Sequence, residues 1–128
     1  MTLAHLLLVD DEQQILRALR PALTAAGYEV ATAETGEAAL SHLAGEAFDV
    51  VLLDLGLPDM DGHELGRRLR ARLGEGCVLI ALSGYGQDSD RERAQVSGFA
   101  HYLVKPVEPA QLHALIAGIP VNGTAQRG

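Results

Sequence analysis

The chain has 128 residues, a length that suits one domain with a sizeable hydrophobic core. Its formal net charge of −7 argues against a main role in binding nucleic acid or anionic membranes. Because no apolar run approaches the roughly 20 residues of a membrane span and the N-terminus lacks a signal peptide, a cytoplasmic protein is expected.

Five short apolar segments predict β-strands, and a helical pattern follows each of them. In chain order, the strands are expected at 5–10, 28–33, 49–55, 77–83 and 100–105. The first, third and fourth are continuous apolar runs, which are typical of parallel strands buried on both faces. The other two are weaker and suit the edges of a sheet. The single cysteine, Cys77, excludes a disulfide and is expected to be a small buried strand residue.

The helices are predicted from apolar residues that repeat at a spacing near 3.6. They are expected at 15–26, 35–44, 61–73, 88–97 and 108–119. Pro21 is expected to kink the first helix or to cost it a hydrogen bond, and Asp61 and Glu64 have the spacing of a capping box. Five strand–helix repeats predict an α/β fold, with a parallel sheet covered by helices on both faces. One domain is expected over residues 1–120, followed by a loose tail over 121–128.

Chemically distinctive side chains follow the ends of four predicted strands. They are Asp10, Asp11, Asp54, Ser83 and Lys105. Ligands of an open parallel sheet bind beyond the carboxyl ends of its strands, so these residues are expected to share one site. Clustered carboxylates repel one another and oxygen ligands suit Mg²⁺, which predicts a magnesium site. Magnesium, an ammonium and a hydroxyl can together neutralise a phosphoryl group that is transferred to a carboxylate nucleophile.

Lys105 is the only lysine among ten basic residues, since the other nine are arginine. In such a composition, a lone lysine indicates a site that needs a compact charge instead of a planar guanidinium. Local alternatives remain open: Asp10 and Asp11 as caps of the following helix, and Lys105 as an ordinary surface lysine. Asp59 and Asp61 are interpreted as turn and cap residues.

Two other groups of residues are given structural interpretations. The five histidines, which show no metal-ligand spacing, are expected to face solvent: His5, His42, His63, His101 and His113. A basic stretch on the third helix is expected to form a solvated face, with contact to an acidic partner as the alternative: Arg67, Arg68, Arg70 and Arg72.

Four motifs together give the chain a family resemblance. In order they are LLVDDE, LLDLGLPDMDG, ALSGYG and LVKP. With these motifs at family-like spacing, the sequence resembles the receiver domain of two-component response regulators from residue 5 to about residue 119. The resemblance implies a flavodoxin-like, three-layer (βα)5 fold, similar to that of the chemotaxis regulator. Its doubly wound central sheet would have five parallel strands in the order 2-1-3-4-5.

The resemblance also implies a role for each matching residue. The expected roles are Asp54 as phosphoacceptor; Asp10, Asp11, Asp54 and the Gly56 carbonyl as magnesium ligands; Ser83 and Lys105 as phosphoryl-binding groups; Lys105–Pro106 as a cis peptide; Ser83 and Tyr102 as switch residues; and Gly56 and Tyr85 as residues that tune dephosphorylation. The family pattern favours direct metal contact by Asp11, with Asp10 acting through water. Since Gly56 has no side chain to position water, slow self-dephosphorylation is expected.

The implied function is a phosphorylation-controlled switch that catalyses its own phosphorylation and dephosphorylation. The phosphoryl group would come from a phosphohistidine of a histidine kinase or histidine phosphotransfer protein. Output would pass through the fourth helix, fifth strand and fifth helix to a protein partner, without nucleic acid or membrane contact. The chain would be a monomer or weak dimer, and either a single-domain regulator or a receiver from a hybrid histidine kinase.

Three other functions are alternatives to this switch. A phosphate-independent adaptor with the receiver fold would not need the complete set of site residues. An aspartyl-phosphate phosphatase of the haloacid dehalogenase-like class has its nucleophile at the first strand and a second Asp two residues later, a spacing that VDDEQ lacks. A nucleotide or flavin module is disfavoured because no glycine-rich loop follows the first strand.

Overall fold

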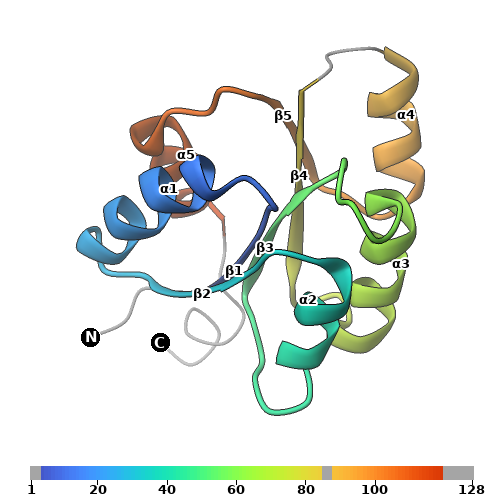
Figure 1. Ribbon diagram of the computed structural model, residues 1–128, viewed down its shortest axis with the longest axis horizontal. Helices are drawn as coiled ribbons and strands as arrows, with labels where there is room; N and C mark the ends of the chain where they lie inside the picture. Colours follow the sequence, from blue (N-terminus) through green and yellow to red (C-terminus); the bar gives the residue numbers. More distant parts are fainter. Residues whose placement is uncertain (1–3, 85–87, 120–128) are drawn as a thin grey trace.

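The protein is described from a computed structural model, which defines residues 4–84 and 88–119. Strands and helices alternate five times along this chain (Figure 1). The elements are β1 (His5–Val9), α1 (Gln13–Ala25), β2 (Glu29–Ala33), α2 (Gly36–His42), β3 (Val50–Asp54), α3 (Gly62–Leu73), β4 (Val78–Ser83), α4 (Asp88–Val96), β5 (His101–Val104) and α5 (Pro109–Ala117). Every predicted element is present, with small shifts at its ends. The predicted tail, 121–128, lies outside the described residues.

The five strands form one parallel sheet in the order β2-β1-β3-β4-β5. The predicted doubly wound, flavodoxin-like fold and its strand order are therefore confirmed. The register aligns the carboxyl ends of neighbouring strands, because Asp54 pairs with Leu82 and Ser83 pairs with Val104. Residues that follow the central strands consequently emerge at one edge of the sheet.

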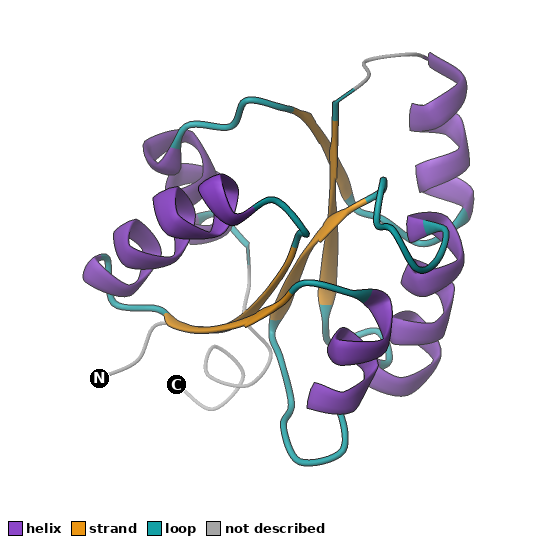
Figure 2. Cartoon of the chain, viewed as in Figure 1, coloured by secondary structure: helices purple, strands orange, loops and turns teal. Residues whose placement is uncertain are grey.

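Helices cover both faces of the sheet (Figure 2): α1 and α5 pack on one face, and α2, α3 and α4 on the other. Successive side chains of a strand point to opposite faces, so each apolar run supplies both cores. On β1, Leu6 and Leu8 join the α1/α5 core, whereas Leu7 and Val9 join the other. Burial on both faces explains why the central strands are continuously apolar.

The α1 helix runs through Pro21 without interruption. Pro21 has no amide hydrogen, but it is exposed, so the backbone carbonyl left without a donor lies on the solvent side of the helix. The helix ends before Gly27, whose φ of 109° is favourable for glycine alone.

Two carboxylates of the β3–α3 loop bind the first turns of two helices. Asp59 accepts hydrogen bonds from the backbone N–H groups of Gly36 (2.8 Å) and Glu37 (3.1 Å) at the start of α2. These bonds lower the pKa of Asp59, the Gly36 bond being the larger cause. Asp61 is the N-cap of α3 and accepts from the N–H of His63. The interpretation of Asp59 and Asp61 as turn and cap residues is confirmed.

The capping box predicted from Asp61 and Glu64 does not form, because the Asp61 side chain accepts from the N–H of His63 and not from that of Glu64. The Glu64 carboxylate does not return to Asp61, because it pairs with Arg67 and Arg68 one turn further along α3. These ion pairs are exposed, and such pairs contribute little to stability.

The prediction that the basic stretch of α3 is a solvated face is wrong for Arg70. Its guanidinium donates to the carbonyl oxygens of Gly74 and Cys77 (both 2.6 Å) and of Gly98 (3.0 Å). One side chain therefore connects the α3–β4 loop to the turn before β5. Cys77 itself is buried just before β4, and burial raises the pKa of its thiol to about 12.

The prediction that the five histidines face solvent is wrong for His63, which is 3% exposed. Its ring lies edge-on to Phe99, with centroids 6.3 Å apart, because α3 packs its first turn toward the start of β5. The other four histidines are half-buried, not fully exposed.

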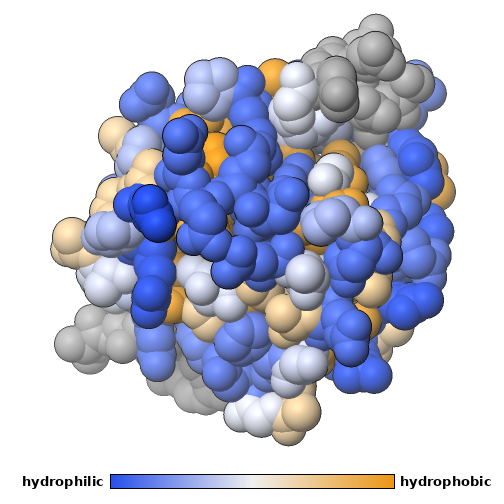
Figure 3. Space-filling view, viewed as in Figure 1, coloured by the Kyte–Doolittle hydropathy of each residue, from blue (hydrophilic) through white to orange (hydrophobic). Residues whose placement is uncertain are grey.

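Hydrophilic residues cover most of the described surface in Figure 3, and apolar ones show in small areas between them. Within residues 4–84 and 88–119, no helix has the length and apolar character needed to cross a membrane.

Replacement of Arg70 by Ala is expected to destabilise the domain. Three carbonyl oxygens would lose a charged donor, and hydrogen bonds to charged groups each contribute roughly 1.5–3 kcal/mol. Because the side chain is only partly buried and water can reach the loops, we expect a loss of about 2 kcal/mol in the free energy of unfolding, measured by urea denaturation. Arg72→Ala, which removes an exposed arginine of the same helix, should change it by less than about 0.5 kcal/mol. Equal effects of the two substitutions would contradict this role.

Candidate functional site

A cleft of about 550 Å³ opens at the carboxyl edge of the sheet, where β1, β3, β4 and β5 end. Its walls come from the loops after these strands, from the start of α3 and from α4. The lining residues are Asp11, Glu12, Asp54, Leu55, Gly56, Asp61, His63, Ser83, Gly84, Arg93 and Lys105. All strand-end residues predicted from the sequence are at this edge, with Asp10 buried beneath it.

Asp10 directly follows β1 and is completely buried. Its backbone N–H continues the ladder to the carbonyl oxygen of Ala33 (3.0 Å), and its Oδ1 accepts from the N–H of Glu12 (2.9 Å). Its Oδ2 lies 2.8 Å from Lys105 Nζ, an ion pair that lacks the alignment of a hydrogen bond. Burial raises the pKa of Asp10, while Lys105 and the Glu12 amide act in the opposite direction.

Asp54 is the last residue of β3 and is 5% exposed. Its Oδ1 accepts a hydrogen bond from the N–H of Gly56 (3.0 Å), and its Oδ2 lies 3.4 Å from Lys105 Nζ. A Cβ at position 56 would lie 3.7 Å from Asp54 Oδ1, so glycine keeps the space beside this carboxylate open.

Lys105 follows β5 and contacts both Asp10 and Asp54. Its backbone N–H donates to the carbonyl oxygen of Ser83 (2.7 Å), which holds the two strand ends together. Its Nζ contacts three carboxylates: Asp10 at 2.8 Å, Glu12 at 3.1 Å and Asp54 at 3.4 Å. Burial alone would lower the pKa of Lys105, but these carboxylates more than offset it and raise the pKa. The peptide bond between Lys105 and Pro106 is cis.

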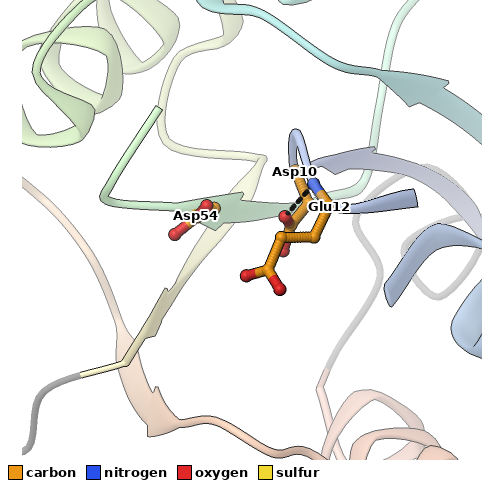
Figure 4. A group of neighbouring side chains, drawn as sticks. All are labelled: Asp10, Glu12 and Asp54. Atoms are coloured by element: carbon orange, nitrogen blue, oxygen red, sulfur yellow. Dashed lines mark hydrogen bonds between the residues drawn. The ribbon is translucent and has the colours of Figure 1, made fainter. Parts of the chain in front are cut away.

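Glu12 is a site residue that the sequence analysis missed. One carboxylate oxygen from each of Asp10, Glu12 and Asp54 lies within 4.8 Å of the others (Figure 4). Asp11, predicted as the direct metal ligand, lies outside this group, because it is exposed on the cleft wall. The available signal was the third consecutive acid in the motif LLVDDE.

Ser83 and Tyr102 lie on neighbouring strands. Ser83 ends β4 and is 4% exposed, whereas Tyr102 is half-buried on β5 and packs against the core under α3 and α4. The guanidinium carbon of Arg91, on α4, lies 4.8 Å from the centroid of the Tyr102 ring. Tyr85, the other residue predicted to affect dephosphorylation, lies outside the described residues.

One side of the cleft is closed by an ion pair between Arg93 of α4 and Asp61 at the start of α3. Both side chains are largely exposed, so this contact links α4 to the start of α3 at the rim and is not part of the buried carboxylate group.

Comparison with known proteins identifies relatives along nearly the whole chain. Residues 6–117 match the response regulator receiver domain. The chain is 48% identical over 100 residues to the transcriptional regulatory protein KdpE of Mycobacterium tuberculosis. The aligned segment covers 78% of this chain and 43% of KdpE. It is 40% identical over 114 residues to the response regulator protein FleR of Pseudomonas aeruginosa. That aligned segment covers 89% of this chain and 24% of FleR. The chain thus spans less than half the length of these two relatives.

Solved structures show the same fold. A response regulator receiver domain protein (CheY-like) from Methanospirillum hungatei superposes with a TM-score of 0.87 at 31% identity, over 99% of this chain and 100% of that one. The chemotaxis response regulator CheY4 of Vibrio cholerae gives a TM-score of 0.83 at 30% identity, over 91% and 98% of the two chains. The sheet order, the carboxylates and lysine at its edge, and these matches agree: the chain belongs to the response regulator receiver domain family.

Proposed function

We propose that this domain accepts a phosphoryl group from a phosphohistidine onto Asp54 in a magnesium-dependent reaction. The observation that carries the proposal is the convergence of Glu12, Asp54 and Lys105 in one cleft at the ends of three strands, with Asp10 buried directly beneath them. The donor would be a histidine kinase or histidine phosphotransfer protein that docks at the rim of the cleft and on α1.

Asp54 is the nucleophile in this proposal. A carboxylate oxygen of Asp54 would attack phosphorus as the bond from phosphorus to the imidazole nitrogen breaks, and that nitrogen keeps the electron pair. The hydrogen bond from Gly56 to Oδ1 and the nearby Lys105 ammonium fix the orientation of the carboxylate. The small exposed fraction of Asp54 limits the access of bulk water to the acyl phosphate.

The residues of the cleft fit a magnesium ion. All candidate ligands are oxygens, and the buried Oδ2 of Asp10 has no aligned hydrogen bond, so it retains acceptor capacity. Asp10, Asp11, Asp54 and the Gly56 carbonyl would hold the ion, which supplies positive charge to the phosphoryl oxygens. Lys105 and the Ser83 hydroxyl would bind those oxygens from the β4–β5 side of the cleft.

Phosphorylation would alter the surface formed by α4, β5 and α5. In the proposal, Ser83 moves toward the phosphoryl group and the Tyr102 ring turns inward. Because Tyr102 lies against Arg91, its displacement would disturb α4 directly. Output through this surface would reach a protein partner. A free-standing regulator and a receiver from a hybrid histidine kinase remain the two proposed contexts, although KdpE and FleR are named as regulators, not kinases.

The first test is phosphorylation by acetyl phosphate with Mg²⁺, followed by intact mass measurement. Wild type is expected to gain one phosphoryl group, whereas Asp54→Asn should gain none because the nucleophile is removed. Glu75→Gln, a substitution of an exposed carboxylate, should behave as wild type. The added mass should persist well beyond seconds, since Gly56 provides no side chain to position water.

The proposal is contradicted if wild type reacts with neither acetyl phosphate nor a phosphohistidine donor. Partner binding that is unchanged by Asp54→Asn would favour a phosphate-independent adaptor. Steady turnover of a phosphomonoester by the pure protein would favour a phosphatase.

The second test is stabilisation by magnesium. An ion that binds only the folded state stabilises it by about 1.4 kcal/mol at a tenfold excess over its dissociation constant. For a domain of this size, that corresponds to a rise of about 5 °C in Tm by calorimetry when EDTA is replaced by Mg²⁺. Asp11→Asn should reduce the rise, and Glu75→Gln should keep it. An equal rise in both variants would argue against Asp11 as a ligand.

A further inference from the structure

We propose that Glu12 restrains Lys105 in the unphosphorylated domain, competing with the phosphoryl group for its ammonium and so lowering the extent of phosphorylation. This inference rests on the function proposed above, because it assigns a positioning residue to the same site. It concerns a residue outside the predicted set of phosphoacceptor, metal ligands and phosphoryl-binding groups.

Of the three carboxylates around the Lys105 ammonium, Glu12 is the one whose contact has the geometry of a hydrogen bond. An ammonium has three N–H donors, and three carboxylates surround Nζ: Asp10 at 2.8 Å, Glu12 at 3.1 Å and Asp54 at 3.4 Å. Asp54, the proposed phosphoacceptor, is the most distant of the three. A phosphoryl group on Asp54 would be a further negatively charged acceptor, so it would compete with these carboxylates for the Lys105 ammonium.

Glu12 is the partner that can be released at the lowest cost. Asp10 is completely buried, and a buried carboxylate without a counter-charge is strongly destabilised. The Glu12 side chain is 57% exposed, so water can solvate its carboxylate once Lys105 leaves. The Glu12–Lys105 contact is therefore the one expected to break when Asp54 becomes phosphorylated.

The local structure of Glu12 supports a specific contact with Lys105. Glu12 is at the N-cap position of α1, where the side chain of a Ser, Thr, Asp or Asn usually accepts from a backbone N–H of the first turn. Its side chain makes no such cap bond. Its Oε1 instead accepts a hydrogen bond from Lys105, a residue 93 positions further along the chain. Its backbone N–H binds Asp10, which fixes Glu12 beside the buried pair.

The negative charge of Glu12 also opposes phosphorylation of Asp54. Phosphorylation would replace the single charge of the Asp54 carboxylate with roughly two phosphoryl charges, a net gain of about one negative charge in a group whose carboxylate oxygens already lie within 4.8 Å of one another. Like charges at this separation repel, so Glu12 would favour the unphosphorylated state even after Lys105 has moved.

The test compares Glu12→Gln and Glu12→Asp with wild type, and Glu29→Gln serves as a control for an exposed carboxylate elsewhere. The phosphorylated fraction is measured by intact mass at limiting acetyl phosphate and saturating Mg²⁺. Glu12→Gln should raise the ratio of phosphorylated to unphosphorylated protein about two- to fivefold, the range expected for a largely exposed ion pair. Glu12→Asp should also raise it, because its shorter side chain cannot reach Nζ. Glu29→Gln should leave it unchanged.

A second measurement follows Lys105 without requiring phosphorylation. Since Lys105 is the only lysine, protein labelled with ¹⁵N-lysine gives a single Nζ signal by NMR. This signal should shift in unphosphorylated Glu12→Gln and Glu12→Asp relative to wild type. After addition of beryllofluoride, a phosphoryl mimic, it should be the same in all three proteins, because Lys105 has then left Glu12.

Each outcome decides for or against the restraint. An Nζ signal that is identical in wild type and Glu12→Gln overturns it, even if wild type is phosphorylated normally. The restraint is also overturned if Glu12→Gln has the same phosphorylated fraction as wild type or a smaller one. It is overturned as well if Glu12→Gln needs a tenfold higher Mg²⁺ concentration, because Glu12 would then be a metal ligand. If wild type gains no phosphoryl group, the proposed function fails, and the Nζ signal still tests the Glu12–Lys105 contact separately.

Discussion

The ammonium of Lys105 balances carboxylates that the fold forces together at one edge of the sheet. Asp10 is wholly buried, and Asp54 is nearly so, yet both lie within 3.4 Å of the same nitrogen. Without this positive charge, the carboxylates would repel one another in an environment that screens them poorly. Three carboxylates around one ammonium leave a net negative charge, which suits a divalent cation.

The sheet provides the geometry that this balance requires. Apolar runs on β1 and β3 are buried on both faces, so the residues that follow them have little freedom in position. The backbone bond from Lys105 to Ser83 fixes the end of β5 against β4. In the proposed switch, movements of Lys105 or Ser83 would be passed to β5, where Tyr102 lies against Arg91 of α4. A site built on strand ends can therefore connect local charge to a distant surface.

The sequence predicted the parts of this structure that depend on local pattern. The apolar runs predicted the strands because each is buried on both faces, and the residues after them predicted the site because parallel strands share an edge. Three features escaped prediction because they depend on contacts between distant segments. Arg70 binds carbonyl groups of two loops, His63 is buried against Phe99, and Glu12 reaches Lys105 from the other end of the chain.

The central claim, that Lys105 supplies the charge holding the carboxylates together when no metal is bound, is tested most directly by the stability of Lys105→Met with and without magnesium. In EDTA, the variant should lose about 2–3 kcal/mol of unfolding free energy relative to wild type, because Asp10 is left buried without a counter-charge. Mg²⁺ should recover most of this loss, since it supplies the missing charge. Equal stability of the two proteins in EDTA, or a magnesium effect no larger than that on wild type, would contradict the account.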